Sequence, residues 1–173
     1  ISLGLVGSEM CIRDSCNKIK GVDIETAPFP GFPTDLQAPF TTLMAIANGE
    51  SKITETIFEN RMNHVHLLNK MGANIKLNKN IAYIKGVKKF KGMDLVGSDL
   101  RSSAALIIAG IIAEGTSRIY GLEHLDRGYE NFESKLKSLG IKITREFNKK
   151  TLTNKELKTC LLYTSDAADE GLG

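Results

Sequence analysis

A segment of about 65 residues occurs twice in this 173-residue chain, and the repeat restricts the folds that the chain can adopt. The stretch "ANGESKI" at residues 47–53 matches "AEGTSRI" at residues 113–119. Each is preceded by an apolar stretch that opens with Asp-Leu, at Asp35 in the first copy and at Asp99 in the second. We therefore predict two copies of one structural unit, at residues 34–97 and 98–146.

Both copies predict the same order of elements. An apolar helix is predicted to end at Gly49 or Gly115, because glycine is favoured just beyond a helix C-terminus. A short strand follows, "SKITET" or "TSRIYG", and then an amphipathic helix that ends at Gly72 or Gly140. Further short strands complete the pattern: "NIKLN", "IAYIKG" and "MDLVGSD" in the first copy and "IKITRE" in the second. Alternating strands and helices of this kind predict an α/β fold built from repeated units.

The residues just before the apolar helices are typical of helix N-termini. Thr34 and Ser98 are predicted N-caps, because a hydroxyl there can accept a hydrogen bond from a free backbone N–H. Gln37, three residues after Thr34, fits the capping-box pattern.

The repeat also places acidic and basic side chains at equivalent positions. Asp35, Asp99 and Arg101 lie at expected helix starts, and Arg61 and Arg127 lie at the starts of the second helices. Helix N-termini favour anions, and the planar guanidinium of arginine matches carboxylate and phosphate groups. Three converging arginines predict a site for a small, multiply charged anion. A nearby aspartate could take a proton from a substrate hydroxyl or stabilise a developing cation.

Other interpretations of the same residues remain open. An aspartate at a helix start is most often a cap, and an arginine on a helix is usually a solvated surface charge. Lysine-rich stretches such as "KGVKKFKG" are typical of solvated hairpins, although a basic chain also allows RNA binding as an alternative. His64 and His66 have no third ligand nearby in the sequence, so we predict no metal site.

Cysteine usage and hydropathy indicate the cellular context. Three cysteines at irregular spacing predict neither a disulfide framework nor a zinc site, which favours a reducing, cytoplasmic compartment. No apolar run is long enough to span a bilayer, and no signal peptide is visible.

Both ends of the chain are expected to be foreign to the protein. "VGSEMCIRDS" and "CLLYTSDAADE" back-translate into the two ends of a sequencing-library transposon adapter, and the chain does not begin with Met. Residues 1–15 and 160–173 are therefore expected to be adapter-derived and are excluded from the expected fold, which leaves residues 16–159. Their removal changes the formal charge from +3 to about +7.

Four motifs in order carry a family resemblance: "TAPFPGFPTDLQ", "ITETIFENRMNHV", "DLRSSAALIIAG" and "DRGYENFESKLKSLG". They resemble the C-terminal part of the UDP-N-acetylglucosamine 1-carboxyvinyltransferases, a branch of the enolpyruvyl transferase family, from about residue 21 to 146. The resemblance implies repeated βαβαββ units around buried helices, in the family's inside-out α/β barrel, with this chain forming part of one domain. The repeat described above agrees with that expectation.

The resemblance also implies a reaction. The enolpyruvyl group of phosphoenolpyruvate is transferred to the 3′-hydroxyl of UDP-N-acetylglucosamine, the first committed step of peptidoglycan synthesis in the bacterial cytoplasm. No metal or organic cofactor is implied, and neither nucleic acid nor a membrane is an expected partner.

The resemblance assigns roles to six residues. Asp35 matches the aspartate that contacts the sugar and is proposed to deprotonate its hydroxyl, and Ile57 matches a backbone contact to the UDP-sugar. Arg61, Arg101 and Arg127 match arginines around phosphoenolpyruvate and the reaction intermediate. Asp99 matches a second acid beside the reacting centre.

The chain departs from the family pattern in a few places. Phe29 stands where many relatives carry His, and Pro39 replaces a residue more compatible with a helix. The family's loop with a catalytic Cys, and an early Lys and Arg, belong to an N-terminal part that this chain does not contain. We therefore expect the chain alone to be inactive. The alternatives are a non-catalytic, RNA-binding βαβαββ module and a degraded or regulatory paralogue.

Overall fold

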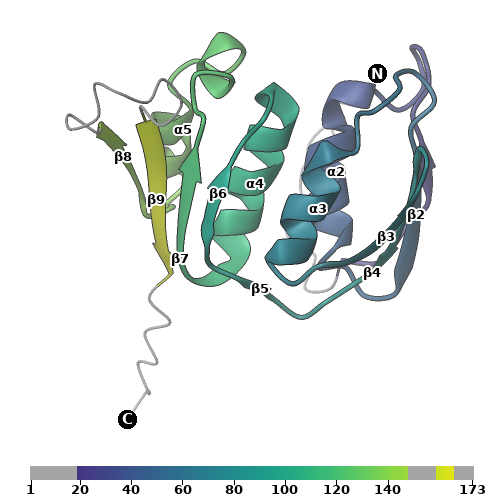
Figure 1. The fold of residues 1–173 in the computed structure, drawn as a ribbon, viewed down its shortest axis with the longest axis horizontal. Coiled ribbons are helices and arrows are strands. Elements are labelled where there is room, and N and C mark those ends of the chain that lie inside the picture. Colours follow the sequence, from purple (N-terminus) through teal and green to yellow (C-terminus); the bar gives the residue numbers. More distant parts are fainter. Residues whose placement is uncertain (1–18, 148–158, 166–173) are drawn as a thin grey trace, which may run out of the picture.

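The computed structural model describes residues 19–147 and 159–165, which form two β-sheets with helices between them (Figure 1). The first sheet and its helices comprise β1 (Ile24–Glu25), η1 (Thr34–Leu36), α2 (Gln37–Met44), β2 (Glu50–Thr54), α3 (Asn63–Lys70), β3 (Asn74–Asn78) and β4 (Ile81–Lys85). The second group comprises β5 (Phe90–Lys91), β6 (Asp94–Val96), α4 (Leu100–Ile112), β7 (Ala113–Tyr120), η2 (Leu125–Arg127), α5 (Phe132–Ser138), β8 (Ile143–Phe147) and β9 (Thr159–Ser165).

Apart from β5, which pairs parallel with the start of β7, the two sheets have the same topology. In the first, β1 is parallel to β2, and β4 pairs antiparallel with both β2 and β3. In the second, β6 is parallel to β7, and β9 pairs antiparallel with both β7 and β8. The predicted α/β fold of two repeated βαβαββ units is therefore confirmed. Each unit begins with the strand that precedes its apolar helix, β1 or β6. These strands lie before residues 34 and 98, where the units were predicted to start.

Helices α2, α3 and α4 lie between the sheets and form the core with them (Figure 1). α4 is apolar around most of its circumference, which allows it to be buried on several sides. Small buried residues, among them Ala105 and Ala109, allow close helix packing, and the Thr42 hydroxyl of α2 donates to the Ala105 carbonyl at 3.3 Å. Within the described ranges, no helix is both long and apolar enough to cross a membrane.

The predicted glycine positions are correct for the second helix of each unit. Gly72 (φ 101°) follows α3 and Gly140 (φ 85°) follows α5, and both adopt the left-handed conformation that glycine favours. Gly49 (φ 103°) and Gly115 (φ 88°) also have positive φ. However, α2 and α4 end several residues earlier, so these two glycines turn the chain in or before a strand and do not end a helix.

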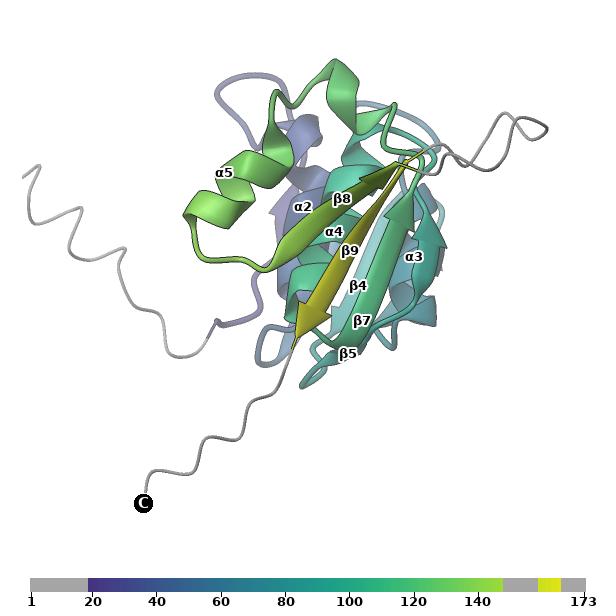
Figure 2. The same cartoon turned by 90° about the vertical axis from the view of Figure 1, so that its left-hand side faces the viewer.

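Strand β9 lies within a terminal segment that was excluded from the expected fold. It pairs with β7 and β8, with Leu162 opposite both Arg118 and Thr144 (Figure 2). β9 thus occupies in the second unit the place that β4 occupies in the first. Excluding this segment from the fold was wrong for residues 160–165. That residues 1–15 and 160–173 derive from adapters stays a prediction.

Candidate active site

One carboxylate and two guanidinium groups meet between the helix starts. Asp35 lies in η1, directly before α2, and its Oδ1 is 2.7 Å from Nε and 2.5 Å from Nη2 of Arg101 in the first turn of α4. Nη1 of Arg61, just before α3, is 3.6 Å from the same oxygen. The Asp35 side chain is 70 % exposed, whereas those of Arg61 and Arg101 are 22 % and 31 % exposed. The structure therefore brings three of the predicted residues together at an accessible site.

Asp99 caps α4. Its Oδ1 accepts hydrogen bonds from the backbone N–H groups of Arg101 and Ser102, each at 3.0 Å, and its Oδ2 accepts one from the Ser98 hydroxyl at 3.1 Å. The prediction that Ser98 is the N-cap was wrong, because the neighbouring carboxylate is the better acceptor for these donors. In this structure Asp99 fixes the helix turn that carries Arg101.

Thr34 is not a helix cap either. Its hydroxyl donates to Glu55 Oε2 at 2.7 Å and accepts from Arg61 Nη1 at 3.1 Å, so it is not free to cap α2. Gln37 is buried, and its Nε2 donates to Thr41 Oγ1 at 3.2 Å and lies 3.0 Å from Met62 Sδ. The predicted capping box between Thr34 and Gln37 was therefore wrong.

The buried acid Glu55 follows β2 and was missed by the sequence analysis. Its carboxylate accepts hydrogen bonds from the hydroxyls of Thr26 (2.9 Å) and Thr34 (2.7 Å) and from the backbone N–H groups of Ile57 (2.9 Å) and Phe58 (3.2 Å). Burial raises the pKa of Glu55, but these four hydrogen bonds outweigh it and leave the pKa below its ordinary value. Glu55 is therefore ionised at neutral pH.

A sequence signal for this buried acid existed. Side chains in a strand alternate between its two faces, and Ser51 and Ile53 of β2 are both buried. Two residues further, the same alternation points Glu55 inward. An acid on the buried face of a strand predicts a hydrogen-bonded carboxylate.

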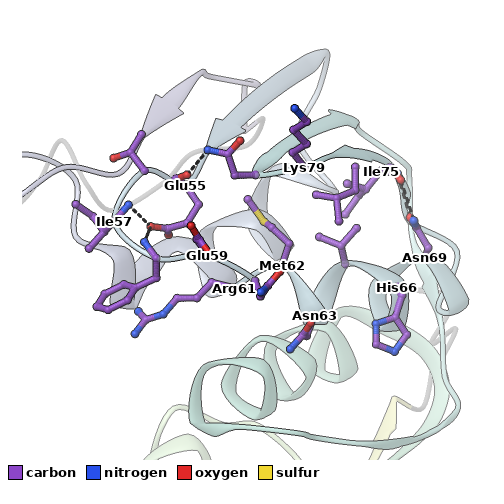
Figure 3. A pocket seen from close by; sticks show the side chains of 16 residues that line it. Glu55, Ile57, Glu59, Arg61, Met62, Asn63, His66, Asn69, Ile75 and Lys79 are labelled. Atoms are coloured by element: carbon purple, nitrogen blue, oxygen red, sulfur yellow. Dashed lines mark hydrogen bonds between the residues drawn. The ribbon is translucent and has the colours of Figure 1, made fainter.

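Ile57 lies on the wall of a cavity of about 930 Å³ between the loop at residues 55–63, α3 and the β3–β4 hairpin. Figure 3 shows Ile57, Glu55 and Arg61 on one side and His66 and Asn69 on the other. The backbone N–H of Ile57 donates a hydrogen bond to Glu55 Oε1 at 2.9 Å. The Arg61 guanidinium carbon lies 3.6 Å from the centre of the neighbouring Phe58 ring, a cation–π contact.

A smaller cavity of about 240 Å³ lies beside the starts of α2, α3 and α4. Its lining includes Arg61, Arg101, Asp99 and the buried His64. Burial lowers the pKa of His64 to about 4, although Asp99 and a backbone hydrogen bond at Arg61 favour its charged form, so this imidazole is neutral at pH 7. Among residues 19–147 and 159–165, no three His, Cys, Asp or Glu side chains gather in a way that could hold a metal ion.

Arg127 is placed apart from the other predicted arginines. It ends η2 and is exposed, and within the described residues it makes no ion pair or hydrogen bond with Asp35 or Asp99. The turn itself packs on α4, because a Cβ added to Gly128 would lie 2.8 Å from a methyl group of Leu100. The structure therefore places the backbone of Arg127 near the start of α4 but not its side chain in the cluster.

Comparisons with known proteins agree with this architecture. The family model described as EPSP synthase (3-phosphoshikimate 1-carboxyvinyltransferase) matches residues 7–136. A UDP-N-acetylglucosamine 1-carboxyvinyltransferase of Prochlorococcus marinus (strain MIT 9301) is 91% identical over 155 residues, which cover 90% of this chain and 33% of the relative. The protein of that name from Synechocystis sp. (strain PCC 6803) is 57% identical, over 73% of this chain and 29% of the relative. The chain thus spans about a third of the length of these curated relatives.

Two solved structures with a similar fold are an enolpyruvyl transferase and an EPSP synthase. The enolpyruvyl transferase NikO from Streptomyces tendae has a TM-score of 0.66 and 27% identity, over 72% of this chain and 29% of that protein. An EPSP synthase from Acinetobacter baumannii, at 15% identity and a TM-score of 0.57 over 84% of this chain and 30% of that protein, shares the fold. Since the family match extends over most of its length, this chain belongs to the EPSP synthase family of enolpyruvyl transferases.

Proposed function

We propose that this chain is part of a UDP-N-acetylglucosamine 1-carboxyvinyltransferase. The whole protein would transfer the enolpyruvyl group of phosphoenolpyruvate to the 3′-hydroxyl of UDP-N-acetylglucosamine and release phosphate, in the first committed step of peptidoglycan synthesis. The observation that carries the proposal is the accessible Asp35 carboxylate held by Arg61 and Arg101, on a chain 91% identical to a relative of that name. The remaining catalytic groups would come from parts of the protein outside this chain.

Asp35 is proposed to take the proton of the substrate hydroxyl. The sugar oxygen attacks C2 of phosphoenolpyruvate while C3 gains a proton, which gives a tetrahedral intermediate. Phosphate then leaves from C2 as C3 loses a proton, and the enolpyruvyl ether remains. Arg61 and Arg101 both contact Oδ1 of Asp35, so Oδ2 is the oxygen proposed to receive the hydroxyl proton.

The smaller cavity is proposed to hold the charged groups of phosphoenolpyruvate. Arg61 and Arg101 line it, and the starts of α3 and α4 add the partial positive charge of helix N-termini. Arg127 is proposed to contribute from η2 in the complete protein. Asp99 would act beside the reacting centre by holding the turn that carries Arg101. Preorganised positive charge of this kind would stabilise the negative charge that the phosphate gains as it leaves C2.

The larger cavity is proposed to take the UDP-sugar. The Ile57 carbonyl would contact the sugar, next to the half-exposed ring of Phe58. We propose that the reaction occurs in the bacterial cytoplasm, without a metal or organic cofactor and without nucleic acid or a membrane as a partner.

A segment exchange tests the function. Residues 21–146 of this chain would replace the aligned segment of the Prochlorococcus marinus (strain MIT 9301) relative, and phosphate release would be measured with both substrates. We expect turnover within about tenfold of the parent enzyme, none when 3-phosphoshikimate replaces the UDP-sugar, and none from the isolated chain. A folded hybrid without transfer activity would contradict the function. Robust turnover by the isolated chain would contradict the proposal that it holds only part of the site.

A further inference from the structure

Glu55 has no step in the chemistry proposed above, yet it is among the most buried charged groups described, with 1 % of its surface exposed. Its four hydrogen-bond donors come from the two segments that carry the candidate site. Thr26 and Thr34 belong to the loop that leads to Asp35, and Ile57 and Phe58 belong to the loop that leads to Arg61. A buried carboxylate is stable only when such donors satisfy it, so its position fixes both loops relative to each other.

The direction of each hydrogen bond follows from the chemistry of the groups. Ionised Glu55 can only accept, so the single hydroxyl proton of Thr34 points to its Oε2 at 2.7 Å. Arg61 can only donate, so its Nη1 donates to the lone pair of Thr34 Oγ1 at 3.1 Å. The hydrogen bonds therefore run in one direction, from the Arg61 guanidinium to the Thr34 hydroxyl and from that hydroxyl to the Glu55 carboxylate. The same Nη1 lies 3.6 Å from Oδ1 of Asp35.

A second connection runs from Glu55 to Arg61 through the loop backbone. The N–H groups of Ile57 and Phe58 both donate to Oε1 of Glu55, which fixes the backbone that carries the Phe58 ring. That ring lies 3.6 Å from the guanidinium carbon of Arg61. Arg61 is thus held from one side by a hydroxyl and from another by an aromatic face, and Glu55 orders both.

We propose that Glu55 is a positioning residue that sets the orientation of Arg61 against Asp35 through the hydroxyl of Thr34 and the ring of Phe58. Its kinetic consequence rests on the proposed function, whereas its effect on Arg61 does not. The negative charge is essential to the arrangement. In a Glu55→Gln variant an amide NH2 can replace Oε2. The hydroxyl of Thr34 would then lie between two N–H donors, that amide and the guanidinium of Arg61, and its own proton would have no acceptor on residue 55.

The first test uses variants at Thr34 in the hybrid enzyme. Thr34→Val keeps the shape but removes the hydroxyl, and we expect kcat/KM to fall about 10- to 100-fold. Thr34→Ser restores the hydroxyl and should stay within about threefold of the parent. The matched control is Thr42→Val, which removes a buried hydroxyl that bonds to the Ala38 and Ala105 carbonyls and should leave the kinetics unchanged.

A double-variant cycle separates positioning from general stability. If Thr34 acts through Arg61, then Thr34→Val should add less than about twofold once Arg61→Lys is present. Full additivity of the two losses would overturn the inference, as would wild-type kinetics for both Thr34→Val and Glu55→Gln.

The second test is independent of turnover and uses this whole chain. Side-chain NMR of arginine-labelled chain reports whether the Arg61 guanidinium is held, through slow rotation of its Nη groups. We expect that signature in the wild type and in Thr34→Ser, and its loss in Thr34→Val and Glu55→Gln. If NMR shows a held Arg61 in this chain but the hybrid enzyme is inactive, the result would count against the proposed function alone. A held Arg61 in both disruptive variants would overturn the positioning role of Glu55.

Discussion

Arg101 binds Asp35 across the boundary between the two repeats, with Nη2 at 2.5 Å and Nε at 2.7 Å from the same carboxylate oxygen. The two residues lie at the starts of α4 and α2, which are equivalent helices. Neither unit contains this pair by itself, so packing of the two units creates it. An exposed ion pair contributes little to stability, and its importance lies in the position that it gives to the carboxylate.

Asp35→Asn should remove the proton acceptor with almost no change in shape. In the hybrid enzyme we expect kcat to fall by about 10²- to 10⁴-fold, because an amide cannot take the proton of the sugar hydroxyl. Steady-state phosphate release measures this loss. Asp94→Asn is the matched control, because Asp94 forms a surface ion pair with Arg118 and should change kcat less than about twofold. Near-normal turnover of the Asp35 variant would leave Asp35 without the role of base.

Replacement of Arg101 should distinguish charge from geometry. Arg101→Ala should lower kcat/KM by at least about 100-fold, since both Asp35 and the bound anion lose a partner. Arg101→Lys should recover only part of this loss, because one ammonium group cannot supply both the Nε and Nη2 contacts. Kinetics of Arg118→Ala provide the control for loss of a surface arginine. Full activity in Arg101→Lys would show that a positive charge at this position is sufficient for activity and that the two contacts to Asp35 are not needed.

Stability should fall in acid because of His64. Its pKa is about 4 in the folded chain and about 6.5 when unfolded, so the unfolded state binds the proton first as the pH falls. We expect the free energy of unfolding of this chain to decrease by about 3 kcal/mol between pH 6.5 and pH 4, measured by urea unfolding. The lowered pKa of Glu55 acts in a different window, since its contribution is present above about pH 4.5 and is lost below it.

Two variants isolate the contribution of this histidine. His64→Gln should remove the slope between pH 4 and 6.5, whereas the exposed His66→Gln should keep it. An unchanged slope in His64→Gln would assign the acid sensitivity to other groups.

Two glycines should respond differently to alanine. A Cβ on Gly86 would lie 1.6 Å from the carbonyl oxygen of Ala47, a backbone atom that cannot move aside easily. We therefore expect Gly86→Ala to destabilise this chain by more than about 3 kcal/mol. Gly72 has open space around it but a φ of 101°, so Gly72→Ala should cost about 1 kcal/mol. Urea unfolding of both variants measures the difference, and equal losses would contradict the predicted contact at Gly86.

Much of the fold could be predicted from the sequence, because its signals act over short separations. The repeat, the order of strands and helices, and the glycines that end α3 and α5 follow from local periodicity and backbone preference. The repeat also indicated that Asp35, Arg61 and Arg101 lie at helix starts, where the structure brings them together. Their catalytic roles stay a prediction.

The tertiary structure alone decided which donors and acceptors meet. Thr34 bonds to Glu55 and not to its own helix, and the side chain of Arg127 lies outside the cluster. β9 enters the second sheet between β7 and β8, which the expected origin of that segment had excluded. Local patterns determine each element, but a hydrogen-bond partner 20 to 70 residues away is determined only when packing brings the two segments together. The sequence by itself therefore determined the units, and their packing determined the site.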